Sequence, residues 1–253
     1  MSTEGKVAVI TGATGGIGFE VAKRLGQDGF TVILNGIDDA AGAERIKELA
    51  AEGITAEYVG FDVTNEEAVI KNIKAIGDKY GKIDTLVNNA GGLGGRSRFE
   101  EMTTEFYRSV MALNLDSTFF ASRAAIPYLK KGVHPSIINY TSNAAWTAGG
   151  PGAGIYGTSK AGVNAITRAL AKDLAEYGIR VNAVSPGTID TPFHAQIKAT
   201  KPEVFASWAN NIMLGRLGQP SDVAGVVSFL AGKDAAFITA ETIQIGGGQA
   251  LGI

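Results

Sequence analysis

The chain has 253 residues, 45% of them hydrophobic, with 23 basic and 25 acidic side chains and a formal net charge of −2. This composition argues against a disordered acidic chain and against a nucleic-acid binder with a basic surface. The chain has no cysteine, which excludes disulfides, thiolate catalysis and cysteine-ligated metal or iron–sulfur sites. It has two histidines and no HExxH pattern, so we expect no metal site.

Short apolar, β-branched runs predict seven β-strands, at residues 7–11, 31–35, 56–61, 84–89, 136–142, 180–185 and 241–245. Most lack polar alternation, which is typical of strands that are covered on both faces. Helical patterns fall between them, at 17–27, 39–51, 65–79, 104–131, 157–177 and 221–231. Asn65 is expected to cap the third helix. The alternation predicts an α/β fold, with a doubly wound parallel sheet of about seven strands and helices on both faces.

The stretch 187–219 is irregular, and we expect it to form a lid over a substrate site. The start of the chain is polar and runs directly into an apolar strand, without the apolar core of a signal peptide. No window approaches the run of about 18 apolar residues that a membrane helix needs. We therefore expect one domain over residues 1–253, in the cytoplasm, with no membrane partner.

A glycine-rich run, Thr11-Gly-Ala-Thr-Gly-Gly-Ile-Gly18, lies between the first predicted strand and the first predicted helix. Glycine lets a pyrophosphate approach the backbone, and a helix N-terminus offers free N–H groups and a partial positive charge. This position in a strand–turn–helix unit predicts a dinucleotide site in a Rossmann-type domain. The alternative is a glycine-rich turn that binds nothing.

Tyr156 and Lys160 stand at the start of the long helix near 157–177. A spacing of four places both side chains on one helix face. A free tyrosine has a pKa of about 10. An adjacent ammonium would lower this pKa toward the range that suits proton transfer. Ser142 ends the fifth predicted strand, where its hydroxyl can hold a substrate carbonyl beside the phenol. A YxxxK pair alone also occurs on surface helices that have no such role.

The TGxxxGxG run, NNAG at 88–91, the YxxxK pair and Pro186-Gly187 occur in an order and spacing that resemble the short-chain dehydrogenase/reductase family. The resemblance covers nearly the whole chain. It implies an NAD(P)-dependent oxidoreductase and a homotetramer. It also implies that Tyr156 donates a proton to the carbonyl in reduction. The catalytic residues that it implies are Asn114, which would hold a water beside the lysine, Ser142, Tyr156 and Lys160.

The same resemblance implies a set of cofactor-binding residues. These are Gly12, Thr14, Gly16, Ile17, Gly18, Asp38, Asp62, Val63, Asn89, Ala90, Gly91, Tyr156, Lys160, Pro186, Gly187, Ile189 and Thr191.

The end of the second predicted strand bears on the choice of dinucleotide, because an acidic residue there favours NAD. Gly36 stands where NAD-dependent relatives carry aspartate, and Ile37 stands where many NADP-dependent relatives carry arginine. With no cation to meet an extra phosphate, and with Asp38 placed to repel one, we favour NAD(H) over NADP(H). The alternative is that Asp38 or Asp39 caps the following helix.

The loops at 89–96, 149–156, 185–194 and 247–249 resemble reductases of 4-deoxy-L-erythro-5-hexoseulose uronate, a product of alginate breakdown. These enzymes form 2-keto-3-deoxygluconate, so the resemblance implies a keto sugar acid as substrate.

Four side chains are candidates for binding that substrate. Arg96 is placed to pair with its carboxylate, with Arg98 as a rival. Trp146 is placed to form a wall of the pocket and His194 to bond hydroxyls, while Ser142 holds the carbonyl. Each of Arg96, Trp146 and His194 also has a purely structural interpretation.

Other functions remain open from the sequence. A 3-oxoacyl thioester reductase, or another short-chain alcohol dehydrogenase such as a hydroxysteroid enzyme, would share the catalytic residues. A dinucleotide-sensing regulator would not need the tyrosine–lysine pair. A nucleic-acid binder on a Rossmann scaffold is disfavoured by the charge balance.

Overall fold

The fold, given by a computed structural model that describes residues 5–249, is built on a seven-stranded parallel sheet with the order β3-β2-β1-β4-β5-β6-β7. The predicted α/β doubly wound sheet is therefore confirmed. The strands are β1 (Lys6–Ile10), β2 (Phe30–Gly36), β3 (Ala56–Gly60), β4 (Thr85–Asn88), β5 (Ser136–Tyr140), β6 (Arg180–Pro186) and β7 (Thr242–Ile245).

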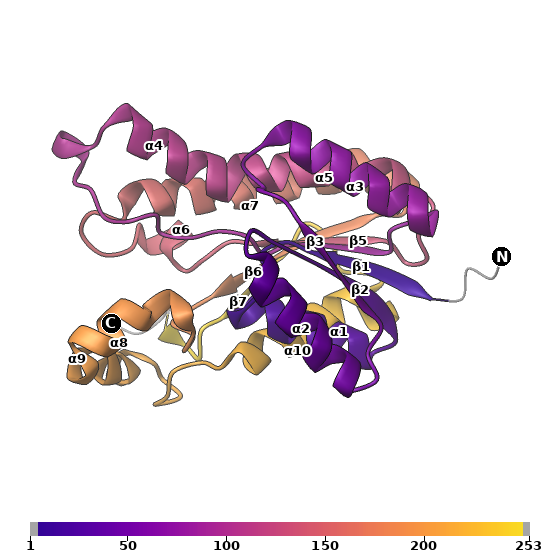
Figure 1. The fold of residues 1–253 in the computed structure, drawn as a ribbon. Helices are drawn as coiled ribbons and strands as arrows, with labels where there is room; N and C mark the ends of the chain where they lie inside the picture. The colour runs from indigo at the N-terminus through magenta and orange to yellow at the C-terminus, as the bar shows by residue number, and fades with distance from the viewer. Residues whose placement is uncertain (1–4, 250–253) are drawn as a thin grey trace.

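Helices cover both faces of the sheet (Figure 1). One layer holds α1 (Gly16–Gln27), α2 (Asp39–Ala51) and α10 (Pro220–Ala231). The other holds α3 (Glu66–Tyr80), α4 (Thr104–Met111), α5 (Ser117–Leu129) and α7 (Gly154–Leu174). Each face has its own apolar cluster, one around Leu25 and Val227 and the other around Ile73 and Leu129. This burial on both faces explains the unbroken apolar runs of the strands.

The remaining helices are short. They are α6 (Ala144–Thr147), α8 (Ala195–Thr200) and α9 (Pro202–Ser207), with 3₁₀ turns at Phe99–Glu101, Ala175–Tyr177, Pro192–His194, Trp208–Asn211 and Lys233–Ala235.

The ends of α3 follow from its sequence. Asn65 accepts a hydrogen bond from the Ala68 backbone N–H at 3.0 Å, so it caps the helix as predicted. Gly81 ends the helix in the left-handed region, with φ 76°, a conformation that glycine adopts without a Cβ clash.

The predicted helix over 104–131 is confirmed as far as Leu129, but it is not α-helical throughout. A π-helical turn, Ala112–Asp116, separates α4 from α5. Such a turn holds one residue more than an α-helical turn, and it changes which side chains face inward. Here it buries Asn114, whose Nδ2 donates to the Val110 carbonyl at 2.9 Å.

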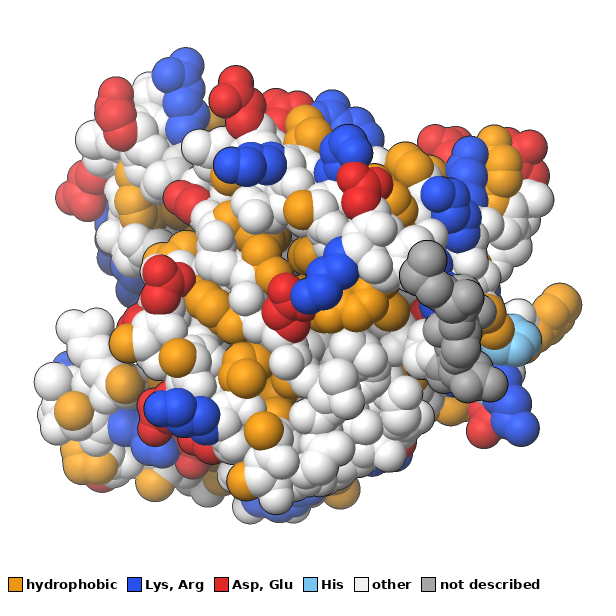
Figure 2. Space-filling model, turned by 45° about the vertical axis from the view of Figure 1, so that its right-hand side comes forward, with side chains coloured by type: hydrophobic (Ala, Val, Ile, Leu, Met, Phe, Trp, Pro, Cys, Tyr) orange, Lys and Arg blue, Asp and Glu red, His pale blue; other side chains and the backbone are white. Residues whose placement is uncertain are grey.

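The irregular stretch 187–219 carries α8 and α9, which lie outside the two helix layers (Figure 1). Its ends meet in a parallel bridge between Ile189 and Gly218. That it moves as a lid stays a prediction. Figure 2 shows acidic and basic side chains interspersed over the face in view, without a field of one sign. Among residues 5–249, no helix is both long enough and apolar enough to span a bilayer.

Candidate active site

The turn between β1 and α1 requires glycine at two places. Gly12 has φ 63°, and a Cβ on it would lie 2.9 Å from the Ala90 Cα. A Cβ on Gly18 would lie 2.5 Å from the Gly12 carbonyl oxygen, so the helix can approach the turn only with glycine here. Asn89, the residue after β4, fixes the turn, because its Nδ2 donates to the carbonyls of Thr11 and Gly12, each at 2.9 Å.

The N-terminus of α1 is open to a ligand. Its N-cap residue is Gly15, which has no side chain that could occupy the N–H groups of the first turn. Among residues 5–249, and apart from its two chain neighbours, no heavy atom lies within 4 Å of the place where a Cβ on Gly15 would stand. Free N–H groups and an open approach at a helix N-terminus fit the pyrophosphate of a dinucleotide. The twelve-residue α1 is long enough to carry the dipole that favours such an anion.

A cavity of about 470 Å³ opens at the carboxyl edge of the sheet, where β1, β4, β5 and β6 end. Ligands of open α/β sheets bind at this edge, beside the point where the strand order reverses. The predicted residues that line it are Gly12, Gly16, Ile17, Gly18, Asn89, Gly91, Arg96, Ser142, Tyr156, Lys160, Pro186, Gly187, Ile189, Thr191 and His194.

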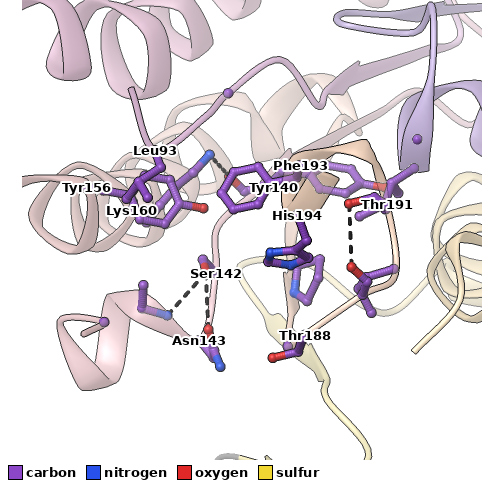
Figure 3. Close-up of a pocket in the computed structure, with 18 of the residues that line it drawn as sticks. Leu93, Tyr140, Ser142, Asn143, Tyr156, Lys160, Thr188, Thr191, Phe193 and His194 are labelled. Carbon is purple, nitrogen blue, oxygen red and sulfur yellow. Dashed lines mark hydrogen bonds between the residues drawn. The ribbon is translucent and has the colours of Figure 1, made fainter. Parts of the chain in front are cut away.

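Other predicted residues do not line this cavity. They are Thr14, Asp38, Asp62, Val63, Ala90, Asn114 and Trp146. The cavity is also lined by residues that the sequence did not point to, among them Tyr140, Asn143, Thr188 and Phe193. In Figure 3, Ser142, Tyr156 and Lys160 lie on one side of the pocket, and Thr188, Thr191 and His194 lie on the other.

Tyr156 and Lys160 lie in the first two turns of α7 and both line the cavity. The Lys160 side chain is 3% exposed. Its Nζ donates a hydrogen bond to the Tyr140 backbone carbonyl at 2.9 Å and lies 5.8 Å from the centroid of the Tyr156 ring. The amine is therefore beside the phenol, but its hydrogen bond goes to the backbone of β5.

The protonation of this pair differs from the sequence expectation. Burial raises the pKa of Tyr156 above its usual value, and the Ser142 hydroxyl acts in the opposite direction. Burial lowers the pKa of Lys160 to about 8. The expected lowering of the tyrosine pKa by the lysine ammonium is therefore not found, because desolvation has the larger effect. Tyr156 is held in its neutral form, which can donate a proton.

Ser142 lies just beyond β5, between that strand and α6. Its Oγ accepts a hydrogen bond from the Ala144 N–H at 3.2 Å and can donate to the Asn143 Oδ1 at 3.3 Å. These contacts orient the hydroxyl at the wall of the cavity, on the same side as Tyr156 (Figure 3).

Asn114 is fully buried, and backbone groups pair with both N–H donors of its amide and with its oxygen. Its Oδ1 accepts from the Gly92 N–H at 3.0 Å, and its Nδ2 donates to the carbonyls of Gly92 and Val110 at 2.8 and 2.9 Å. A Cβ on Gly91 would lie 2.8 Å from Asn114 Oδ1 and 2.9 Å from Lys160 Nζ. Asn114 thus fixes the loop against which the lysine packs. That it holds a water stays a prediction.

Of the side chains predicted to bind the substrate, Arg96 and His194 line the cavity and Trp146 does not. Arg96 lines the cavity with an exposed side chain, and its Nη1 donates to the Pro151 carbonyl at 2.8 Å. His194 also lines it, half-buried, with its ring centroid 5.0 Å from that of Phe193 and 5.3 Å from that of Trp208. Burial lowers the pKa of His194. Trp146, by contrast, is 56% exposed on α6 and forms no wall of the cavity.

The end of β2 differs from a typical NAD site. Gly36 is buried, and a Cβ on it would lie 2.5 Å from the Thr14 Cγ2, so an acid at this position would require the threonine side chain to move. Asp38 caps α2 by accepting from the Ala41 N–H at 3.0 Å, which confirms the capping alternative for this residue. Further along the chain, Asp62 accepts from the Thr64 N–H at 2.8 Å.

A cation lies near the glycine-rich turn, although no sequence pattern indicated one. Arg45, on α2, donates from Nε to the Thr14 carbonyl at 3.3 Å. Its Nη1 forms an ion pair with Glu48. Arg45 follows Thr14 by 31 positions in the sequence, so only the folded chain shows the contact.

Comparisons with known proteins agree with this geometry. A family model described as enoyl-(acyl carrier protein) reductase matches residues 12–250. A diacetyl reductase ((S)-acetoin forming) of Staphylococcus aureus is 43% identical, with 98% of both chains covered. A 3-oxoacyl-(acyl-carrier-protein) reductase of Thermotoga maritima is 38% identical, with 98% of this chain and 99% of that protein covered.

Solved structures give the same picture. A variant of actinorhodin polyketide ketoreductase with NADPH superposes with a TM-score of 0.92 at 33% identity, over 98% of both chains. A putative gluconate dehydrogenase from Agrobacterium tumefaciens gives a TM-score of 0.90 at 31% identity, over 97% of this chain and 96% of that one. The names of these proteins include different carbonyl and alcohol substrates, so they support the type of reaction without selecting a substrate.

Proposed function

Since the chain belongs to the short-chain dehydrogenase/reductase family of NAD(P)-dependent oxidoreductases, we propose that it reduces the carbonyl group of a keto sugar acid. The substrate proposed first is 4-deoxy-L-erythro-5-hexoseulose uronate, which would become 2-keto-3-deoxygluconate. The observation that carries the proposal is one cavity that holds a neutral phenol, Tyr156, together with the guanidinium of Arg96.

The dinucleotide would be held by the turn Gly12–Gly18 and the N-terminus of α1, together with Thr191, which lies beside Gly16, and Gly187, which also lines the cavity. When bound, it supplies the hydride. Tyr156 donates its hydroxyl proton to the carbonyl oxygen, and Ser142 orients that oxygen by a hydrogen bond. Lys160, with its pKa of about 8, still carries a proton at neutral pH and can replenish the phenol.

Arg96 supports an acidic substrate. One of its nitrogens is held by the Pro151 carbonyl, which fixes the guanidinium at the cavity and leaves its other donors for a carboxylate. His194, on the other side of the pocket (Figure 3), would bond sugar hydroxyls in its neutral form, which burial favours.

We favour NAD(H) over NADP(H) as the coenzyme. Asp38, two residues beyond β2, caps α2 and carries a negative charge that would repel a 2′-phosphate. Arg45 lies near the turn, but Glu48 pairs with its charge. The charge of Asp38 disfavours an extra phosphate at this end of the site.

The proposed enzyme is a single domain with a lid at 187–219, and it assembles as a homotetramer in the cytoplasm. Half-exposed aromatic side chains on α4 and α5, Tyr107 at 44% and Phe119 at 40%, support pairing through that helix layer.

A second candidate is reduction of a small diketone or an acyl thioester. It is favoured by the 43% identity to a diacetyl reductase and the 38% identity to a 3-oxoacyl reductase. An absorbance assay of NADH and NADPH oxidation decides between the two. We expect the highest kcat/KM with the keto-uronate. A higher kcat/KM with diacetyl or acetoacetyl thioester would select the second candidate and reject the first.

A further inference from the structure

Gln249, four residues beyond the end of β7, holds a residue of the cavity wall, Thr188. Its Oε1 accepts a hydrogen bond from the Thr188 backbone N–H at 2.8 Å, and its Nε2 donates to the Thr188 Oγ1 at 2.9 Å. A Cβ on Gly187 would lie 2.5 Å from the Gln249 Oε1, so the glycine before Thr188 leaves room for the amide. One side chain thus fixes both the backbone and the hydroxyl of Thr188.

The direction of these hydrogen bonds decides what the Thr188 hydroxyl can still do. A backbone N–H can only donate, so the amide oxygen of Gln249 faces it and the amide nitrogen faces the hydroxyl. The Thr188 Oγ1 is therefore an acceptor toward Gln249, and its own proton remains to be donated. Among residues 5–249, this hydroxyl makes no second hydrogen bond.

Thr188 is accessible to a ligand. It is half-buried and lines the cavity, across the pocket from Ser142 and Tyr156 (Figure 3). Its carbonyl accepts from the Gly218 N–H at 3.0 Å, so the polar groups of its backbone are both paired. A rigidly held residue that offers one unused donor at the wall of a cavity is suited to fix the orientation of a ligand.

The neighbours of Thr188 indicate which end of the cavity it faces. The carbonyl of Pro186, at the end of β6, accepts a hydrogen bond from the N–H of Asn143, the residue after Ser142, at 3.2 Å. From there the chain comes beside the glycine-rich turn only at Thr191. Two strands, β4 and β5, separate β6 from β1 and its turn. Thr188 therefore lies toward the reacting end of the cavity.

We propose that Thr188 is a ligand-binding residue, which donates its hydroxyl proton to an oxygen acceptor at the reacting end of the cavity. Gln249 is its positioning residue, because the amide directs that proton away from itself. The acceptor belongs either to the nicotinamide half of the coenzyme or to the carbonyl substrate. The inference rests on the proposed function, since it assumes that both ligands occupy this cavity.

The first test compares Thr188→Val, which removes only the hydroxyl, with Thr188→Ser, which keeps it. The Kd of NADH, or of NADPH if that binds more tightly, is measured by calorimetry without substrate. The KM of the substrate is measured at saturating coenzyme. One of the two should rise about 5-fold in Thr188→Val, the size typical of one hydrogen bond. A rise in Kd places the acceptor on the coenzyme, and a rise in KM alone places it on the substrate.

Three values should stay near those of wild type. They are kcat in Thr188→Val, because Tyr156 is untouched, the Kd of ADP, which lacks the nicotinamide half, and every constant in Thr188→Ser. Thr242→Val is the matched control, since it removes a threonine hydroxyl on β7 that bonds to Asn164, outside the cavity lining.

The second test reverses the hydroxyl. In Gln249→Glu one carboxylate oxygen still accepts from the Thr188 N–H, but the other can only accept, so the hydroxyl donates to it instead of to the ligand. This variant should show the same loss as Thr188→Val and unfold at a temperature near that of wild type. In the Thr188→Val background, Gln249→Glu should add no comparable loss, and any remaining effect measures the added charge.

If neither the Kd nor the KM rises in Thr188→Val while the enzyme stays active, the inference is overturned and the proposed function stands. Equal weakening of ADP and NADH would overturn the assignment to the reacting end. Equal losses from Gln249→Glu with and without the Thr188 hydroxyl would overturn the positioning role. A wild-type chain that binds neither NADH nor NADPH would overturn the proposed function, and this inference with it.

Discussion

The Nζ atom of Lys160 lies 5.8 Å from the centroid of the Tyr156 ring, on the same face of α7. Its hydrogen bond goes to the backbone of β5 instead of to the phenol. In this arrangement burial has the largest effect on both groups, raising one pKa and lowering the other. Tyr156 is therefore protonated and can donate a proton, as the reduction of a carbonyl requires.

Tyr156→Phe should lower kcat by about 1,000-fold, because positioned general acids contribute roughly 10²–10⁴-fold. The Kd of the dinucleotide should stay near the wild-type value, since the turn Gly12–Gly18 is untouched. Steady-state coenzyme oxidation and a binding titration check the two halves of the prediction. Near-normal turnover in this variant would remove Tyr156 from the mechanism.

Lys160 should make stability depend on pH in a defined window. Its pKa falls from the model-compound value of 10.5 to about 8 on folding, so between these values the unfolded chain binds more protons than the folded one. The free energy of unfolding then rises with pH across that window, by an amount on the order of 2 kcal/mol.

Denaturant titrations of wild type and Lys160→Met at pH 8 and pH 10, roughly the limits of that window, measure this contribution. The difference between wild type and variant should increase toward the higher pH, because the other titrating groups cancel. A difference that is constant or decreases with pH would contradict the buried position of the amine.

Asn114→Ala should destabilise the chain by about 2 kcal/mol, because it leaves buried backbone groups of Gly92 and Val110 without partners. Turnover should fall as well, since the loop against which Lys160 packs is released. Urea unfolding measures the first effect and kcat the second. A variant with wild-type stability would show that this loop does not depend on Asn114.

Gly36→Asp should destabilise the chain and weaken coenzyme binding, because its Cβ would collide with the Thr14 Cγ2. Thr14→Ala/Gly36→Asp should recover most of the loss, giving a coupling of about 1 kcal/mol or more in a double-mutant cycle. Binding titrations with NADH and NADPH, beside thermal unfolding, complete the cycle. Strictly additive effects would mean that the two positions do not share the space.

Arg96→Ala should raise the KM for an anionic keto sugar by about 30-fold, the loss expected for a hydrogen-bonded ion pair. Its effect on an uncharged ketone should be small. Arg98→Ala is the matched control, since Arg98 does not line the cavity, and it should leave both values unchanged. If the KM for the anionic sugar is the same in Arg96→Ala and wild type, the carboxylate contact is rejected.

Much of the architecture could be predicted from the sequence, because strands that are covered on both faces appear as apolar runs and helices begin at caps such as Asn65. The glycine-rich turn was predictable for a similar reason, since its function requires a fixed order of glycines after a strand. The π-helical turn at Ala112–Asp116 was not, because one extra residue in a turn leaves no mark on the apolar periodicity.

Some site residues were placed wrongly or missed from the sequence, because their positions depend on contacts between residues far apart in the chain. Trp146 points outward because the short helix α6 turns it from the cavity. Arg45 reaches Thr14 from another helix, and Gln249 reaches Thr188 from beyond β7. The lowered tyrosine pKa was expected from spacing alone, whereas the depth of burial is a property of the folded chain.

The bridge between Ile189 and Gly218 closes the stretch between β6 and α10 on itself. Hydrogen bonds from the Asp190 N–H to the Gly218 carbonyl, at 2.8 Å, and from the Gly218 N–H to the Thr188 carbonyl, at 3.0 Å, secure this closure. The part of the stretch beyond Thr191 can change length and composition while the sheet, the glycine-rich turn and Thr191 beside it keep their positions. Related proteins can therefore differ in the segment that this bridge closes, and so in the substrate they prefer. The residues that bind the coenzyme outside that segment stay the same.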